Sequence, residues 1–129
     1  RPNRSRGRGG VSLTSSIPVL RVSDYPRARA FWTEVLGFRV VEEAGEPVTG
    51  FGIYRRDAAQ VFLEAWQGPE APYHRWRAYF HTDDLAGLRA AFAAAGAEFR
   101  GPTRTEYRMD EIEITDPDGN VVCFGQDPG

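Results

Sequence analysis

The sequence has few of the features that cross-link, anchor or export a protein. It contains a single cysteine, Cys123, which cannot form an internal disulfide, and this agrees with a reducing compartment. No apolar run approaches the roughly 18 residues that a membrane span needs, and the amino terminus lacks the apolar core of a secretion signal. We therefore expect a soluble cytoplasmic protein with no membrane partner.

Motifs for covalent and metal chemistry are also scarce. The sequence contains no Ser/His/Asp triad, no phosphate-binding glycine loop and no CxxC pattern. Its two histidines, His74 and His81, lie seven residues apart, which is not a metal-ligand spacing. His81 shares strand parity with Tyr79 and is kept as a candidate ligand contact. Cys123 has no base near it in the sequence, so a buried cysteine that packs as a small hydrophobe is favoured over a nucleophile.

The charge of the chain is unevenly spread. All 16 basic residues are arginine, and four of them lie in residues 1–10, where there is no acid. The remainder holds 12 basic and 18 acidic residues, and its net charge of −6 repels phosphate backbones. We therefore expect no nucleic-acid partner for the body of the protein. The Gly/Arg/Ser composition of residues 1–15, without interleaved aromatics, favours a flexible tail over a nucleic-acid arm.

The first half of the chain predicts a β-α-β-β-β unit. Residues 17–22 are typical of a strand, and Ser23 or Asp24 then caps a helix that ends at Gly37, where a positive φ is wanted. Further strands are expected at residues 38–41, 51–55 and 60–66. The apolar stripe of the helix consists of Ala28, Phe31, Trp32, Val35 and Leu36.

The second half repeats this order. A strand at residues 77–82 precedes a cap at Asp83 or Asp84 and a helix that ends at Gly96. Caps and terminal glycines are offset by about 60 residues between the halves, which indicates two copies of one unit. We expect an α+β fold in which two βαβββ repeats form a curved mixed-sheet cup with the helices on its convex side. The expected divisions are a tail at 1–15 and one domain at 16–127, with repeat one at 16–66 and repeat two at 75–127.

The closing hairpin carries the most informative functional pattern. Residues 106–115 alternate charged and apolar side chains as a half-buried strand does, and residues 116–120, DPDGN, are typical of a turn before a last strand. Ile112 and Ile114 then share the buried face. The other face suits a cationic, partly flat ligand, although a solvated strand face gives the same alternation. That other face presents Tyr107, Met109, Glu111 and Glu113.

Several aromatic residues fall at strand ends or between the repeats, where the rim of the cup is expected. Rim aromatics can clamp a planar heterocycle at roughly 0.5–1.5 kcal/mol per stacked pair, and packing of a dimer is the alternative use. Trp32 is assigned to the core because it lies on the helical stripe. The rim candidates are Trp66, Trp76, Tyr79 and Tyr107.

Together these features resemble the vicinal oxygen chelate superfamily, also called the glyoxalase/bleomycin resistance/dioxygenase fold. The resemblance rests on the two strand-cap-helix openings and the DPDGN turn, and it covers residues 16–127. Residues 31–38, FWTEVLGF, after a Pro-Val-Leu strand are similar to the bleomycin-binding resistance proteins in particular. The resemblance implies a homodimer with ligand clefts at the subunit interface.

Enzymes of this superfamily place His, Gln or Glu at four cup-facing positions that hold a divalent metal. Aligned on the repeated strand-cap pattern, this chain has Ile17, Val61, Arg77 and Cys123 at those positions. Three of the four cannot ligate a hard cation, and Arg77 would repel one. We therefore expect no metal and no cofactor.

The sequence leads to one preferred function and two alternatives. The preferred hypothesis is a metal-free homodimer that sequesters a cationic, heteroaromatic glycopeptide antibiotic of the bleomycin type without catalysis. The alternatives are a metal-dependent lyase, dioxygenase or thiol transferase of the same fold, and a binding module for an unrelated small metabolite. The candidate ligand-binding residues are Trp66, Trp76, Tyr79, His81, Tyr107, Met109, Glu111, Glu113 and Cys123.

Overall fold

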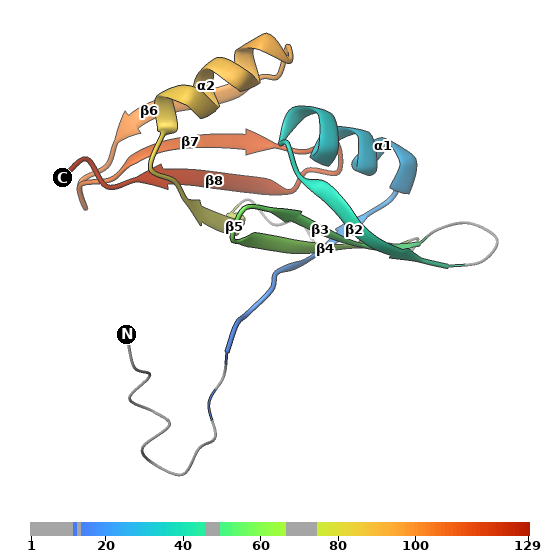
Figure 1. Cartoon of the computed structure of the whole chain (residues 1–129). Coiled ribbons are helices and arrows are strands. Elements are labelled where there is room, and N and C mark those ends of the chain that lie inside the picture. The colour runs from blue at the N-terminus through green and yellow to red at the C-terminus, as the bar shows by residue number, and fades with distance from the viewer. Residues whose placement is uncertain (1–11, 13, 46–49, 67–74) are drawn as a thin grey trace.

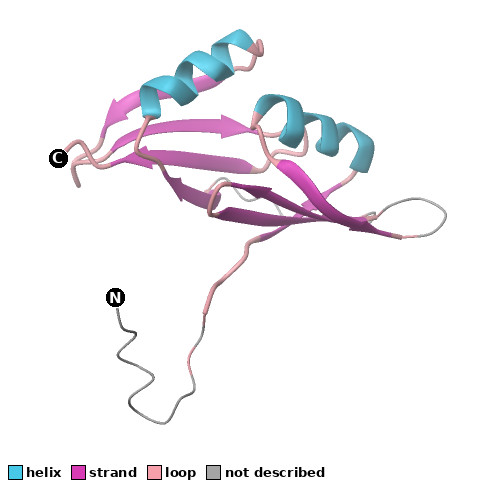
Figure 2. Ribbon diagram, viewed as in Figure 1, coloured by secondary structure: helices cyan, strands magenta, loops and turns pink. Residues whose placement is uncertain are grey.

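A computed structural model of the chain describes residues 12, 14–45, 50–66 and 75–129 and arranges them as two four-stranded sheets with helices on one side (Figures 1 and 2). The elements are β1 Val19–Val22, α1 Tyr25–Ala30, η2 Phe31–Val35, β2 Arg39–Ala44, β3 Phe51–Arg56, β4 Ala59–Ala65, β5 Trp76–His81, α2 Leu85–Ala94, β6 Phe99–Arg104, β7 Asp110–Thr115 and β8 Val121–Gln126. No helix within the described ranges is long and apolar enough to cross a membrane.

Each half of the chain has the predicted β-α-β-β-β order, so the α+β fold with two repeats is confirmed. The strand orders are β1-β4-β3-β2 and β5-β8-β7-β6. The first strand of each repeat pairs in parallel with the fourth, and the other pairs are antiparallel. Both helices lie on the same side of the two sheets, and the opposite side carries no described helix (Figure 1).

The helix of each repeat begins at the second of its two candidate caps. The side chain of Asp24 accepts a hydrogen bond from the backbone N–H of Arg27 at 3.1 Å, and that of Asp84 accepts one from Gly87 at 2.9 Å. Each carboxylate therefore satisfies an N–H group that has no partner within its own helix.

Both helices lead to a glycine with positive φ, as the sequence predicts: 74° at Gly37 and 72° at Gly96. The first helix differs from the prediction by one wider turn, η2, in which the N–H of Leu36 donates to the carbonyl of Phe31 at 3.1 Å. Trp32 in this turn is fully buried, which confirms its assignment to the core.

A row of phenylalanine rings joins the two repeats through the core. The ring of Phe38 lies 5.6 Å from that of Phe80, and Phe80 lies 5.4 Å from Phe124. Phe124 in turn contacts Phe92 of α2 at 5.3 Å. Aromatic pairs at these centroid distances stabilise a core beyond the area that they bury.

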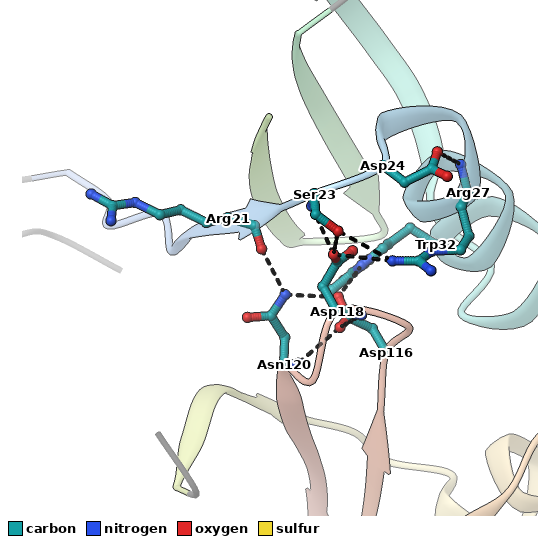
Figure 3. A network of polar contacts seen from close by, with 8 residues as sticks. All are labelled: Arg21, Ser23, Asp24, Arg27, Trp32, Asp116, Asp118 and Asn120. Atoms are coloured by element: carbon teal, nitrogen blue, oxygen red, sulfur yellow. Dashed lines mark hydrogen bonds and ion pairs between the residues drawn. The ribbon is translucent and has the colours of Figure 1, made fainter. Parts of the chain in front are cut away.

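The closing turn of the second repeat is fastened to the first repeat by hydrogen bonds (Figure 3). Asn120 Nδ2 donates to the carbonyl of Arg21 at 3.0 Å and to Asp116 Oδ2 at 2.9 Å. Trp32 Nε1 donates to the same Asp116 oxygen at 3.3 Å. We call Asp116 and Asn120 the cross-repeat latch. Their turn therefore positions β7 and β8 against β1 and the first helix.

Asp118 of the same turn contacts the start of the first helix from outside the latch. Its Oδ1 accepts hydrogen bonds from the backbone N–H and the hydroxyl of Ser23, at 2.7 Å and 2.6 Å, and lies 3.2 Å from the Arg27 guanidinium (Figure 3). The DPDGN turn thus has a structural role between the repeats as well as closing a hairpin.

The closing hairpin is shorter than predicted. β7 begins at Asp110, because residues 105–109 form a tight turn in which the N–H of Thr105 donates to the carbonyl of Met109 at 2.8 Å. The prediction that Tyr107 and Met109 lie on the strand is therefore wrong, since the alternation of the sequence continues into a segment whose local hydrogen bonds favour a turn.

Candidate ligand-binding face

Strand alternation gives the second sheet two faces of different chemistry. Ile112 and Ile114 are buried in the core beneath α2. The residues that alternate with them, Glu111 and Glu113, point to the opposite face, as the sequence predicts. We call this the acidic aromatic face. It carries Trp76, Tyr79, Glu111, Glu113 and Cys123, which strand pairing and side-chain hydrogen bonds bring together.

Glu111 lies on this face and binds two tyrosines. Its Oε2 accepts hydrogen bonds from the Tyr79 hydroxyl at 2.8 Å and from the Tyr107 hydroxyl at 2.6 Å, and the residue is only 6% exposed. The hydrogen bond to Glu111 raises the pKa of Tyr107 to about 12. The pKa of Tyr79 is also raised, mainly by burial and in addition by its hydrogen bond to Glu111. Both phenols therefore remain donors at neutral pH, and Glu111 is committed to orienting them.

A glycine makes room for Tyr79 on this face. Gly125 pairs with Glu111 between β7 and β8, and a Cβ atom on Gly125 would lie 1.8 Å from the Tyr79 hydroxyl oxygen. Any side chain at this position would displace the ring from Glu111. The sequence gives no sign of this role, because the contact joins residues that are distant along the chain.

Glu113 orients a third aromatic residue and stays more accessible. Its Oε2 accepts a hydrogen bond from Trp76 Nε1 at 2.7 Å, and its Oε1 lies 3.9 Å from the Arg100 guanidinium. The Trp76 ring is 4.9 Å from that of Tyr79, which is 5.1 Å from that of His81. The Glu113 side chain is 33% exposed, so it is the carboxylate that a ligand reaches more easily.

Cys123 lies within this face as a protonated thiol. It is fully buried, and burial together with the charges of Glu111 and Glu113 raises its pKa. The thiolate is the form that attacks carbon or binds a metal, so this environment suppresses both reactions. The prediction of a buried, unreactive strand cysteine agrees with this placement.

Some predicted residues lie away from the acidic aromatic face. Trp66 follows β4 in the first repeat, where the Arg21 guanidinium carbon lies 4.2 Å from the centre of its ring. Met109 lies in the turn before β7, with its N–H donated to Thr105 Oγ1 at 3.0 Å. His74 lies outside the described residues.

The prediction that Val61 faces the cup, as one of the four metal positions, is wrong. Val61 is fully buried in the core, so it is the neighbouring Phe62 that points away from the helix. The error arises because residues 61–63 are all apolar, and such a run does not show which face is buried. Within the described ranges, no group of three or more His, Cys, Asp or Glu side chains could hold a metal ion.

A separate groove of about 720 Å³ lies between the repeats and not on the acidic aromatic face. It is lined by the β3–β4 turn, the end of β5 and the start of α2, with Phe38 and Phe80 among its walls. His81 lines the groove and also contacts Tyr79, so it connects the two regions.

The chemistry of the face is suited to holding a ligand. Its rings are fixed by hydrogen bonds to carboxylates, and aromatic faces near a carboxylate attract a cation. Arg100 is a member of this region that sequence reasoning missed. The register of β6 against β7 places Arg100 opposite Glu113, and this register depends on the turn that the sequence pattern concealed.

Comparison with known proteins gives a family match and a set of similar folds. The model of the glyoxalase/bleomycin resistance protein/dioxygenase superfamily matches residues 15–124. No curated protein sequence matches the chain significantly. The structure of a bleomycin resistance determinant encoded on the transposon Tn5 has 21% identity and a TM-score of 0.77, with 91% of this chain and 100% of that chain covered.

Two further structures are similar. A bleomycin-binding protein complexed with bleomycin has 22% identity and a TM-score of 0.74, with 88% of this chain and 98% of that chain covered. A lactoylglutathione lyase from Agrobacterium tumefaciens has 19% identity and a TM-score of 0.68, with 88% of this chain and 94% of that chain covered. At these identities the similarity shows the fold.

Proposed function

Because the chain belongs to the glyoxalase/bleomycin resistance protein/dioxygenase superfamily, we propose that it is a binding protein that sequesters a cationic, heteroaromatic glycopeptide antibiotic of the bleomycin type. Binding is stoichiometric, and no bond of the ligand is made or broken. The protein acts in the cytoplasm, where it protects its host by keeping the drug from its target.

The proposal rests mainly on the acidic aromatic face. The rings of Trp76 and Tyr79 lie 4.9 Å apart, and each donates a hydrogen bond to a carboxylate. Rings that are already fixed lose little freedom when a flat ligand packs on them. A ligand cation beside such rings gains about 0.5–2 kcal/mol, and Glu113 adds an accessible negative charge.

We further propose that the functional form is a homodimer. The first sheet has an apolar face, defined by Val19, Phe51, Ile53 and Phe62, on the side opposite α1. Val19 is 52% exposed there, and the rings of Phe51 and Phe62 lie 5.2 Å apart. A second chain would bury this face, and a ligand would lie between the apolar face of one protomer and the acidic aromatic face of its partner.

The enzyme alternative finds less support. A metal-dependent lyase, dioxygenase or thiol transferase needs clustered donor side chains, and the described part of the chain offers no group of three. The raised pKa of Cys123 also disfavours a thiolate ligand or nucleophile. The fold alone, which the lactoylglutathione lyase shares, does not select between binding and catalysis.

Calorimetric titration with bleomycin tests the proposal. We expect the parent protein to bind the drug, and Glu113→Gln, which keeps the shape and removes the charge, to bind about tenfold more weakly and with less dependence on salt. Glu98→Gln removes an exposed carboxylate outside the face and serves as the matched control. A parent protein that does not bind bleomycin contradicts the proposed ligand. Equal affinities of the two variants contradict the role of Glu113.

A further inference from the structure

Glu113 has one carboxylate oxygen in use and one that a ligand can reach. Oε2 accepts the hydrogen bond from Trp76 Nε1, whereas Oε1 lies 3.9 Å from the Arg100 guanidinium, which is an ion-pair distance too long for a hydrogen bond. Glu111, by contrast, is 6% exposed and binds two tyrosine hydroxyls. An incoming cation therefore meets Glu113 Oε1, and it meets Arg100 at the same place.

The fold fixes the position of Arg100. It pairs with Glu113 between β6 and β7, and the register shifts immediately beyond it, before Thr103. The preceding residue, Phe99, packs into the core with its ring 6.0 Å from that of Phe92. Because successive side chains of a strand point to opposite faces, Arg100 has to point to the acidic aromatic face.

The ion pair itself is weak enough to be displaced. The Arg100 side chain is 87% exposed and that of Glu113 is 33% exposed, so water screens the attraction between them. Exposed pairs of this kind contribute at most about 1 kcal/mol, which corresponds to about a fivefold change in an equilibrium constant.

From this geometry we infer that Arg100 is a specificity-determining residue: it is a built-in counter-ion of Glu113 that a cationic ligand must displace. The inference rests on the proposed use of the acidic aromatic face as a binding site for cations. A neutral aromatic ligand packs on the rings without breaking the ion pair, whereas a cationic one replaces it. Arg100 therefore lowers the ratio of the affinity for cations to the affinity for neutral aromatics. Removing Arg100 raises that ratio.

Matched probes and matched variants test this role. The probes are phenethylammonium and 2-phenylethanol, which share a phenyl ring and differ in charge. The proteins are the parent, Arg100→Gln and Arg104→Gln, the last of which removes an arginine of the same strand that pairs with Asp110 instead. The readout is the indole N–H signal of Trp76 in NMR titrations, assigned by its loss in Trp76→Phe, because this group donates to Glu113.

We expect Arg100→Gln to bind phenethylammonium up to about fivefold more tightly than the parent does. Arg104→Gln should bind it with the parent's affinity, and all three proteins should bind 2-phenylethanol equally. An equal gain for both probes overturns the inference, because Arg100 would then be only a steric obstacle. If Arg100→Gln and Arg104→Gln gain equally in affinity for phenethylammonium, net charge explains the result and the inference is overturned. A Trp76 signal that does not move with either probe in any of the proteins also overturns the inference. If the parent protein does not bind bleomycin but the two probes give the expected result, only the proposed antibiotic is rejected.

Discussion

Asn120 in the second repeat donates a hydrogen bond of 3.0 Å from its side-chain amide to the backbone carbonyl of Arg21 in the first repeat. The same amide donates to Asp116, whose carboxylate also accepts the indole N–H of Trp32. A turn that looks local in the sequence thus joins the two repeats, and the relative position of the two sheets depends on it.

We predict that Asn120→Ala lowers the free energy of unfolding by about 1–3 kcal/mol, because it removes two hydrogen bonds and leaves the buried Asp116 with fewer donors. Urea unfolding measures this change. Glu98→Gln, at an exposed position without a role in the latch, should stay within about 0.5 kcal/mol of the parent. Equal stability of the two variants would show that the latch contributes little.

A second prediction concerns the tyrosines that Glu111 binds. The hydrogen bond to Glu111 raises the pKa of Tyr107 from 10.0 to about 12. Because the pKa is raised in the folded state, the stabilisation is complete below pH 10 and is lost as the pH rises through about 12. In Glu111→Gln the Tyr107 phenol should titrate closer to pH 10. The difference in the free energy of unfolding between the parent and this variant should decrease as the pH rises from 10 to about 12.

Ultraviolet absorbance of tyrosinate measures this titration, and Tyr107→Phe identifies the contribution of Tyr107. If the parent and Glu111→Gln titrate identically, Glu111 does not hold the tyrosines in solution. Tyr79 should respond in the same direction, since burial and Glu111 both raise its pKa.

Short-range signals predicted the positions of both helices, although not the wider turn η2 in the first of them. A capping aspartate and a terminal glycine act within one turn of the helix that they bound, so Asp24, Gly37, Asp84 and Gly96 are visible in the sequence. The face shared by Glu111 and Glu113 was also predicted correctly, because these residues alternate with Ile112 and Ile114.

Longer-range features could not be predicted in the same way. Val61 begins a run of three apolar residues, 61–63, in which period-two alternation gives no information about the buried face. The contact of Tyr79 with Glu111 joins two strands that are separated by a helix and another strand, and it also needs Gly125 beneath the ring. Such contacts follow from strand order and register, which a single sequence does not specify.

A third prediction is that the purified protein carries no stoichiometric divalent metal. Val61 lies in the core, Ile17 and Arg77 have no suitable donor atoms, and the Cys123 thiol is held protonated by its environment. Elemental analysis of dialysed protein and melting with and without a chelator check this. One metal per chain together with a lower melting temperature on chelation would contradict the prediction and favour the enzyme alternative.

The last prediction concerns the proposed dimer. Val19 lies on the edge strand β1 and is 52% exposed, so Val19→Asp places a charge on the apolar face that a second chain would bury. Val41→Asp introduces the same charge on β2, at the opposite edge of that sheet, where the valine is 44% exposed. In sedimentation experiments at micromolar concentration, the parent and Val41→Asp should sediment as dimers, whereas Val19→Asp should sediment as a monomer. Since the ligand is expected between protomers, Val19→Asp should also bind bleomycin more weakly. A monomeric parent that still binds the drug would place the whole site within one chain.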